Sequence, residues 1–215
     1  MRVGFVRVTD DPVPPRLVLA SASPARRRTL QAAGLAAEVM PSGVDESSVT
    51  AATPQQLCQG LARLKAEAVA AAMRSGLTGD EVLVLGCDSV LEFDGEAAGK
   101  PADPADAVAR WRRLRGRKGV LHTGHTLVAC RAGRTAEAVG STTVHFAEVS
   151  DEEIAAYVAT GEPLEVAGGF TIDGLGGPFV AGVEGDPGTV IGLSLPLLRR
   201  LLAELGVPIT TLWRR

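Results

Sequence analysis

The most constraining feature of this sequence is the run VLVL at residues 82–85, framed by Glu81 and Gly86. Four large apolar side chains in succession leave no polar face, so a strand built from them must be covered on both sides. The run LVLA at 17–20 has the same character. Both runs predict central strands that lie between layers of helices.

Helix starts are marked by a capping side chain, in most cases followed by proline, which suits the first helical position. The starts are Ser23-Pro24, Thr53-Pro54, Asp103-Pro104, and the capping box of Ser150 with Glu153. The helix after Thr53 is predicted to bury a stripe of Leu57, Leu61, Leu64 and Ala68.

Two long alternating segments, 121–130 and 135–149, are joined by the turn 131–134 and predict an antiparallel hairpin. A short strand is expected at 38–41, and a last strand and helix after the glycine-rich stretch 168–188. Parallel-type buried strands, helices and a long hairpin together predict an α/β fold with a mixed central sheet and flanking helices. Residues 1–15 are expected to be a loose leader, and 16–215 a single domain.

Composition excludes several classes of function. The 215 residues carry a formal charge of −3 with no block of like charge, which argues against a protein that binds nucleic acid polymers. The three cysteines are far apart and form no CxxC, which favours a reducing compartment. No apolar run approaches a membrane span, and no signal peptide is seen. We therefore expect a soluble cytoplasmic protein.

The strongest candidate for ligand binding is the turn from the first strand into the helix that begins at Pro24. Such a turn presents free backbone N–H groups and the positive end of the helix dipole. Ser21, Ser23 and Arg26 could converge there on a phosphate. An ordinary capped helix with a solvated arginine face explains Ser23 equally well, although it does not require Ser21.

Asp88 is expected just past the end of the strand 81–86, where ligands meet open α/β sheets. Apolar neighbours on both sides bury its carboxylate, which then needs a metal ion or a cationic partner. Asp45 and Glu46 are either solvated loop acids or oxygen ligands for Mg²⁺ or Mn²⁺. Lys100, between Gly99 and Pro101, could present a fixed charge to a phosphate or be an exposed turn lysine.

Other candidates are weaker. Lys65 stands on an alanine-rich helix, where most lysines are simply solvated. His122 and His125 are three apart in a strand and should face opposite sides of the sheet, which is poor for joint ligation. The glycines near Gly174 do not form a dinucleotide-binding fingerprint. Trp111 and Trp213 are expected to be packing residues.

Taken together, these segments resemble the Maf family of nucleotide pyrophosphatases, which share the fold of inosine triphosphate pyrophosphatase. The matching segments are LASASPARR at 19–27, SGVDE at 42–46, LARLKAEAV at 61–69, LGCDSV at 85–90, DGEAAGKP at 94–101, LRGRKGVLHTGH at 114–125, and EPLEVAGGFTIDGLGG at 162–177 leading into GDPGTVIGLSLP at 185–196. Their order and spacing carry the resemblance over nearly the whole chain.

The resemblance implies two lobes around a cleft, and hydrolysis of (d)NTP to (d)NMP and pyrophosphate by metal-assisted attack of water on the α-phosphate. Asp88 matches the catalytic carboxylate of the family. The other matching positions are Ser21, Ser23, Arg26, Lys65 and Lys100 for the phosphates, Glu46, Asp45 and Asp88 for Mg²⁺ or Mn²⁺, and Ala25, Ser89 and Asp173 for specificity. The implied partner is a nucleoside triphosphate, and a homodimer is expected.

The chain departs from the family pattern at two of these positions. Ala25 stands where the family usually has arginine, and Ile172-Asp173-Gly174 where members acting on dTTP and UTP have Ile-Gln-Gly. Both departures bear on the choice of base. A nucleotide-binding regulator of septation without turnover is the main alternative function, and a phosphatase acting on other metabolites is a second.

Overall fold

The computed structural model describes residues 14–74 and 81–213, and most of the expected leader 1–15 lies outside them. Seven strands in the described residues form one sheet. They are β1 (Arg16–Leu19), β2 (Ala37–Val39), β3 (Val82–Phe93), β4 (Glu96–Ala98), β5 (Lys118–Ala129), β6 (Arg134–Phe146) and β7 (Val180–Glu184). The order is β2-β1-β3-β5-β6-β7, with β4 paired to β3. β1 runs parallel to β2 and β3, and the remaining pairs are antiparallel, which confirms the predicted mixed sheet.

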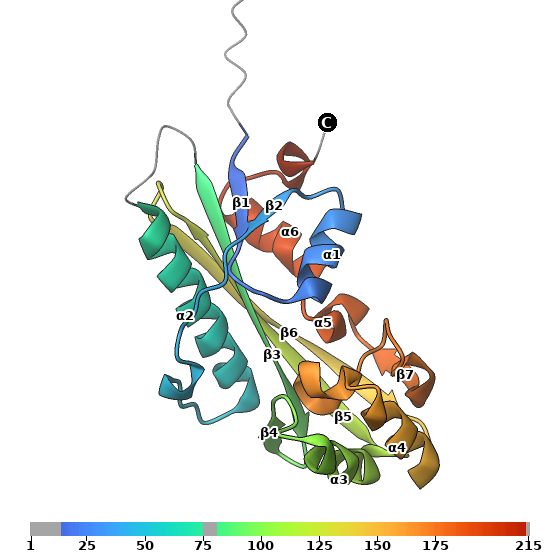
Figure 1. The fold of residues 1–215 in the computed structure, drawn as a ribbon. Coiled ribbons are helices and arrows are strands. Elements are labelled where there is room, and N and C mark those ends of the chain that lie inside the picture. The colour runs from blue at the N-terminus through green and yellow to red at the C-terminus, as the bar shows by residue number, and fades with distance from the viewer. Residues whose placement is uncertain (1–13, 75–80, 214–215) are drawn as a thin grey trace, which may run out of the picture.

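The helices flank this sheet on both faces (Figure 1). Their bounds are α1 (Pro24–Ala32), α2 (Pro54–Arg74), α3 (Pro104–Leu114), α4 (Asp151–Ala159), α5 (Pro187–Ile191) and α6 (Leu195–Glu204). Short 3-10 helices are η1 (Glu46–Ser48), η2 (Glu162–Glu165), η3 (Ala167–Gly169), η4 (Gly177–Phe179) and η5 (Ile209–Leu212). The described residues contain no helix with the length and apolar character needed to cross a bilayer.

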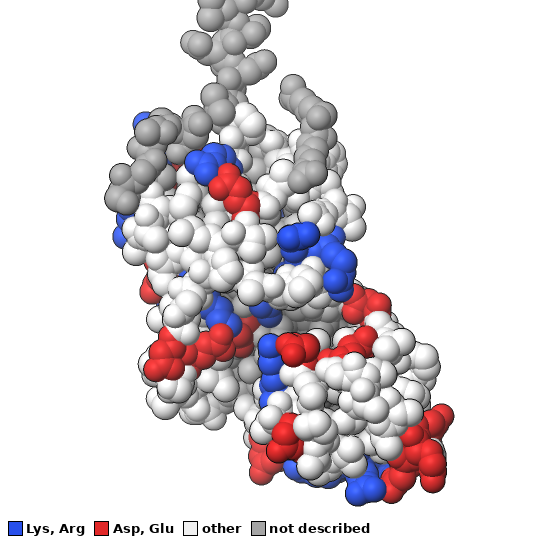
Figure 2. All heavy atoms as spheres, in the orientation of Figure 1, with Lys and Arg blue, Asp and Glu red and all other residues white. Residues whose placement is uncertain are grey.

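Three buried clusters hold the elements together. One lies between β1, β3 and β5 and the helices α1 and α6, and a second lies under α2 on the opposite face. The third surrounds Trp111 at the far ends of the long strands, where α3 and α4 pack. Trp111 makes edge-to-face contacts with Phe146, Tyr157 and Phe179 there. The long strands β3, β5 and β6 thus run from the part of the molecule covered by α1, α2 and α6 to the part where α3 and α4 pack. Figure 2 shows that the surface is hollowed between these two parts.

Several local expectations need correction. β3 is one uninterrupted strand, so Asp88 lies in the middle of it and not past its end. The buried face of α2 includes Leu61 as expected, but otherwise consists of Cys58, Ala62, Lys65, Ala66, Val69 and Ala70. The expected positions Leu57, Leu64 and Ala68 are only partly buried, because this face packs so close to the sheet that mainly small side chains fill it.

The C-terminal region also differs in detail. β7 lies inside the glycine-rich stretch, and two helices, α5 and α6, follow it in place of one strand and one helix. Trp213 is half exposed and forms an isolated bridge with Leu35. Trp111, by contrast, is buried as predicted.

Candidate active site

The turn between β1 and α1 is organised by two serines. Ser23 caps α1 by accepting a hydrogen bond from the backbone N–H of Arg26, and Pro24 takes the first helical position, as predicted. The hydroxyl of Ser21 accepts a hydrogen bond from the N–H of Ser23 over 3.2 Å. Both hydroxyls therefore shape the turn that leads into the positive end of the helix dipole.

Arg26 is buried, with 9% of its surface exposed. Its guanidinium donates to the hydroxyl of Ser21 over 3.0 Å, to the hydroxyl of Ser89 over 3.0 Å, and to the carbonyl of Gly192 over 2.8 Å. A guanidinium has five N–H donors, so two remain for a ligand. Arg26 thus ties α1, β3 and the α5–α6 turn together at one point.

The network continues through residues that sequence reasoning missed. The hydroxyl of Ser89 lies 2.9 Å from that of Thr123, its neighbour across the β3–β5 ladder, and Thr123 donates to the carbonyl of Thr189 over 2.7 Å. Thr123 has one proton to give, so it accepts from Ser89. Thr123 lies in the family-matching segment 114–125, but only the strand register shows that it is opposite Ser89.

Lys65 and Asp88 form the charged centre of the site. The ammonium of Lys65 lies 2.6 Å from Oδ1 of Asp88 and 2.9 Å from Oε1 of Glu46. Lys65 and Asp88 are each 9% exposed, whereas the side chain of Glu46 is 55% exposed. The expectation that Lys65 is solvated was wrong, and the expectation that Asp88 needs a cationic partner is confirmed.

The position of Lys65 depends on a close approach of α2 to the sheet. A Cβ on Gly86 would overlap the backbone carbonyl of Ala62, and one on Gly124 would overlap that of Cys58. Glycine at these two places lets the helix backbone lie directly against β3 and β5. The close approach at Gly86 is therefore made by α2.

Burial raises the pKa of Asp88 above the usual range of a carboxylic acid. The ammonium of Lys65 and the guanidinium of Arg26 oppose the rise, and the nearby carboxylate of Glu46 adds to it. A raised pKa makes a carboxylate a stronger base, which suits it to accept a proton from water.

Two carboxylates could take part in holding a divalent metal ion. Asp88 and Glu46 meet at the same ammonium, so their contacting oxygens lie no more than 5.5 Å apart. Asp45 is directed elsewhere, since its Oδ1 accepts hydrogen bonds from the backbone and hydroxyl of Ser47. No group of three or more His, Cys, Asp or Glu side chains suited to a metal occurs among the described residues. This donor set fits Mg²⁺, which takes one or two carboxylates and completes its shell with water and phosphate oxygens.

Lys100 lies apart from this centre. Its ammonium is 3.7 Å from a carboxylate oxygen of Glu165, and both side chains are largely exposed. It stands on the loop between β4 and α3. In Figure 1 these two elements lie in the lower part of the molecule, well apart from α1.

The remaining predicted positions surround α1. Asp173 lies 3.8 Å from the guanidinium of Arg28, and Ala25 lies in the first turn of the helix.

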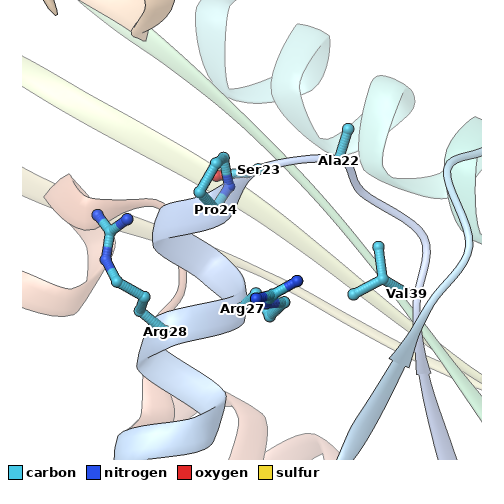
Figure 3. A pocket seen from close by; sticks show the side chains of 6 residues that line it. All are labelled: Ala22, Ser23, Pro24, Arg27, Arg28 and Val39. Carbon is cyan, nitrogen blue, oxygen red and sulfur yellow. The ribbon is translucent and has the colours of Figure 1, made fainter.

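A pocket of about 350 Å³ opens beside the start of the helix, lined by Ala22, Ser23, Pro24, Arg27, Arg28 and Val39. Figure 3 shows that Arg27 and Arg28 leave the helix in different directions, with Arg27 on the side of Val39. Arg27 and Arg28 are both exposed, in agreement with the solvated arginine face that is the alternative interpretation of this helix.

The two histidines that sequence reasoning set aside have separate partners. His122 contacts Ser141 and Glu92, whereas Nε2 of His125 accepts a hydrogen bond from the N–H of Ser194. Burial lowers the pKa of His125 to about 4. Neither histidine contacts Asp88 or Lys65.

Comparisons with known proteins agree with this picture. Residues 16–205 match the family model described as Maf, Maf-like protein. The chain is 70% identical to a protein of Salinispora tropica, with 94% of this chain and 89% of that protein aligned. It is 59% identical to one of Streptomyces coelicolor, with 92% and 94% aligned, and 54% identical to one of Synechococcus elongatus, with 93% and 98% aligned. All three relatives are named nucleoside triphosphate pyrophosphatase.

Among solved structures, the Ham1 protein of Staphylococcus aureus aligns with 62% of this chain and 72% of its own. The TM-score is 0.42 and the sequence identity is 19%. The family assignment rests on the sequence matches alone.

Proposed function

The chain belongs to the Maf family, and we propose that it hydrolyses nucleoside triphosphates to the nucleoside monophosphate and pyrophosphate. The observation that carries the proposal is the buried contact of Asp88 with Lys65, joined by Glu46 on the same ammonium. The names of the relatives, which are 54–70% identical, support the same activity. A cytoplasmic location goes with this proposal.

In the proposed reaction, the oxygen of a water molecule attacks the α-phosphorus, and the bond from that phosphorus to the bridging oxygen of the β-phosphate breaks. Asp88 accepts the proton that the water loses, and pyrophosphate carries away the bonding electrons. The raised pKa of Asp88 favours this role. Phosphoryl chemistry depends mainly on positioning and charge neutralisation, which fits a site built of fixed charges.

The triphosphate is held by groups from both sides of the hollow. We assign to it Lys65, Lys100 and the N-terminal turn of α1 with Ser21 and Ser23. Arg26 keeps two N–H donors for a phosphate oxygen, but its other three hold the turn in place. Arg26 is therefore assigned two roles: it holds the turn between β1 and α1 in place, and it binds a phosphate oxygen.

A divalent metal ion, Mg²⁺ or Mn²⁺, completes the proposed site. Asp88 and Glu46 would hold it, with Asp45 as the neighbouring acid. When bound, the metal would neutralise negative charge on the phosphates. The ammonium of Lys65 contacts both of these carboxylates.

Base selection is assigned to the region of Ala25, Ser89 and Asp173. Asp173 is next to Arg28, so this side of the hollow offers guanidinium donors and carboxylate acceptors together. Ala25 leaves room where the family usually has an arginine. Such a site favours broad acceptance of bases over a preference for dTTP or UTP.

The test of the activity is product analysis over a panel of ribo- and deoxynucleoside triphosphates with Mg²⁺ or Mn²⁺. The proposal expects the monophosphate and pyrophosphate in equal amounts. Inorganic phosphate as the first product would indicate a different phosphatase. Tight nucleotide binding without any product would indicate a regulatory protein.

A further inference from the structure

The charge of Lys100 is carried on a loop, not on a helix or a strand. The loop runs from Gly99 to Asp103, between β4 and α3. The side chain of Lys100 is 62% exposed, and its ion-pair partner Glu165 is 81% exposed at 3.7 Å. Exposed ion pairs of this kind contribute little, so the place of the ammonium depends on the backbone of the loop.

Two residues of α3 form hydrogen bonds with that backbone on both sides of Lys100. Arg110 donates to the carbonyl of Gly99 over 2.8 Å, and Asp106 accepts from the N–H of Ala102 over 2.9 Å. Arg110 and Asp106 are four residues apart and form an ion pair of 2.7 Å. Their side chains are 23% and 33% exposed, which marks them as better buried than the other arginine pairs of this helix.

The opposite side of the loop is held by η3. The N–H of Gly168 donates to the same carbonyl of Gly99 over 3.0 Å, and a Cβ on Gly169 would press against the ring of Pro101. The indole of Trp111 donates to the carbonyl of Gly169 over 2.8 Å. The loop is thereby fixed between α3 and η3, while the side chain of Lys100 stays outside.

We propose that Asp106 and Arg110 are positioning residues that set the place of the Lys100 ammonium for the triphosphate. This inference rests on the proposed function, in which Lys100 binds phosphate. The guanidinium of Arg110 contacts the carboxylate of Asp106 and the loop carbonyls of Gly99 and Lys100, so we assign it a role through Lys100 and not as a phosphate ligand.

A double-mutant cycle tests this relation, using kcat/KM for several nucleoside triphosphates. Lys100→Ala should lower kcat/KM about tenfold for every base, because a charge on a phosphate carries no base information. Arg110→Ala should lower it severalfold, again for every base. In the Lys100→Ala background, Arg110→Ala should have no further effect, because the charge it positions is gone.

The outcomes separate this inference from the proposed function. If Lys100→Ala lowers kcat/KM but Arg110→Ala leaves it within twofold, the positioning role is wrong and the function stands. If the two effects multiply in the double variant, Arg110 acts independently of Lys100, which also overturns the inference. If Lys100→Ala has no effect, the phosphate role assigned to Lys100 fails and the inference fails with it.

Two further variants keep the test decisive if Arg110→Ala folds poorly. Asp106→Asn keeps an oxygen for the N–H of Ala102 but removes the ionic partner of Arg110, and it should give a smaller loss that also vanishes without Lys100. Arg113→Ala is the matched control on the same helix, because its partners are Asp94 and Glu96. It should leave kcat/KM unchanged, and a loss as large as that of Arg110→Ala would contradict the inference.

Discussion

The ammonium of Lys65 lies 2.6 Å from Oδ1 of Asp88, although one residue stands on a helix and the other in the middle of a long strand. The contact is possible because the face of α2 around Lys65 is made of small side chains, and because Gly86 has none. Close packing of a helix on a sheet has thereby brought a cation to a buried carboxylate. The geometry of the candidate site follows from that packing.

Gly86→Ala should destabilise the protein and lower its activity together. The added methyl group overlaps the carbonyl of Ala62, so α2 must move away from β3 and carry Lys65 with it. Overpacking of this kind costs up to about 3 kcal/mol. Urea denaturation measures the free energy of unfolding. Gly182→Ala is the control, because a Cβ there meets no atom within 4 Å. Equal stability of Gly86→Ala and wild type would show that α2 does not pack this closely.

The stability of the protein should fall between about pH 6.5 and pH 4 because of His125. Its neutral ring accepts a hydrogen bond from Ser194, and burial lowers its pKa from 6.5 to about 4. Below pH 6.5 the unfolded chain takes up this proton and the folded protein does not, so the stabilisation is complete above that pH and is lost as the pH falls. The full difference is about 3 kcal/mol.

The readout for His125 is the free energy of unfolding at several pH values in wild type and in His125→Gln, which keeps an acceptor but does not titrate. The variant should lose less stability on acidification. Parallel pH profiles for the two proteins would contradict the assignment.

Arg28 and Asp173 should control the choice of base together. Wild type is expected to accept several bases with kcat/KM values within about tenfold of each other. Arg28→Ala leaves the carboxylate of Asp173, which only accepts hydrogen bonds, whereas O4 of dTTP and UTP needs a donor. The kcat/KM values for dTTP and UTP should therefore fall relative to those for CTP and GTP. Asp173→Gln supplies an amide, which can donate a hydrogen bond, and it should raise kcat/KM for dTTP and UTP.

Arg200→Ala is the control for the base panel, since Arg200 is an exposed arginine paired with Glu204 on α6. It should not change the ranking of bases. A strong preference of wild type for dTTP or UTP would defeat the account of specificity. An unchanged ranking in both variants would show that the pair does not contact the base.

Much of the fold could be read from the sequence, because its signals are local. The proline-marked caps of α1 and α3 and the capping box of α4 lie where predicted, and the β5–β6 hairpin was found from its alternation. The place of Asp88 could not be predicted, because the polar pair Asp88-Ser89 interrupts an apolar pattern that the strand nevertheless continues through.

The environment of Lys65 was beyond sequence reasoning for a different reason. Leucines at helical spacing predict the buried face of an ordinary helix, whereas α2 buries its small residues because Gly86 and Gly124 let its backbone touch the sheet. Only the tertiary packing shows that Lys65 is on that face. In the same way, Thr123 lies in the family-matching segment 114–125, but only the strand register shows that it joins the site.

We propose that Asp88 accepts the proton in hydrolysis at the α-phosphate, and the rate of pyrophosphate release by Asp88→Asn measures this role. The rate should be measured with saturating nucleotide and Mg²⁺ in wild type, in Asp88→Asn, and in the surface control Asp151→Asn, with thermal unfolding as the check on folding. We expect a folded Asp88→Asn protein whose kcat is lower than that of wild type by about 10²–10⁴-fold, while Asp151→Asn keeps the wild-type rate. A folded Asp88→Asn protein that releases pyrophosphate at close to the wild-type rate would contradict it.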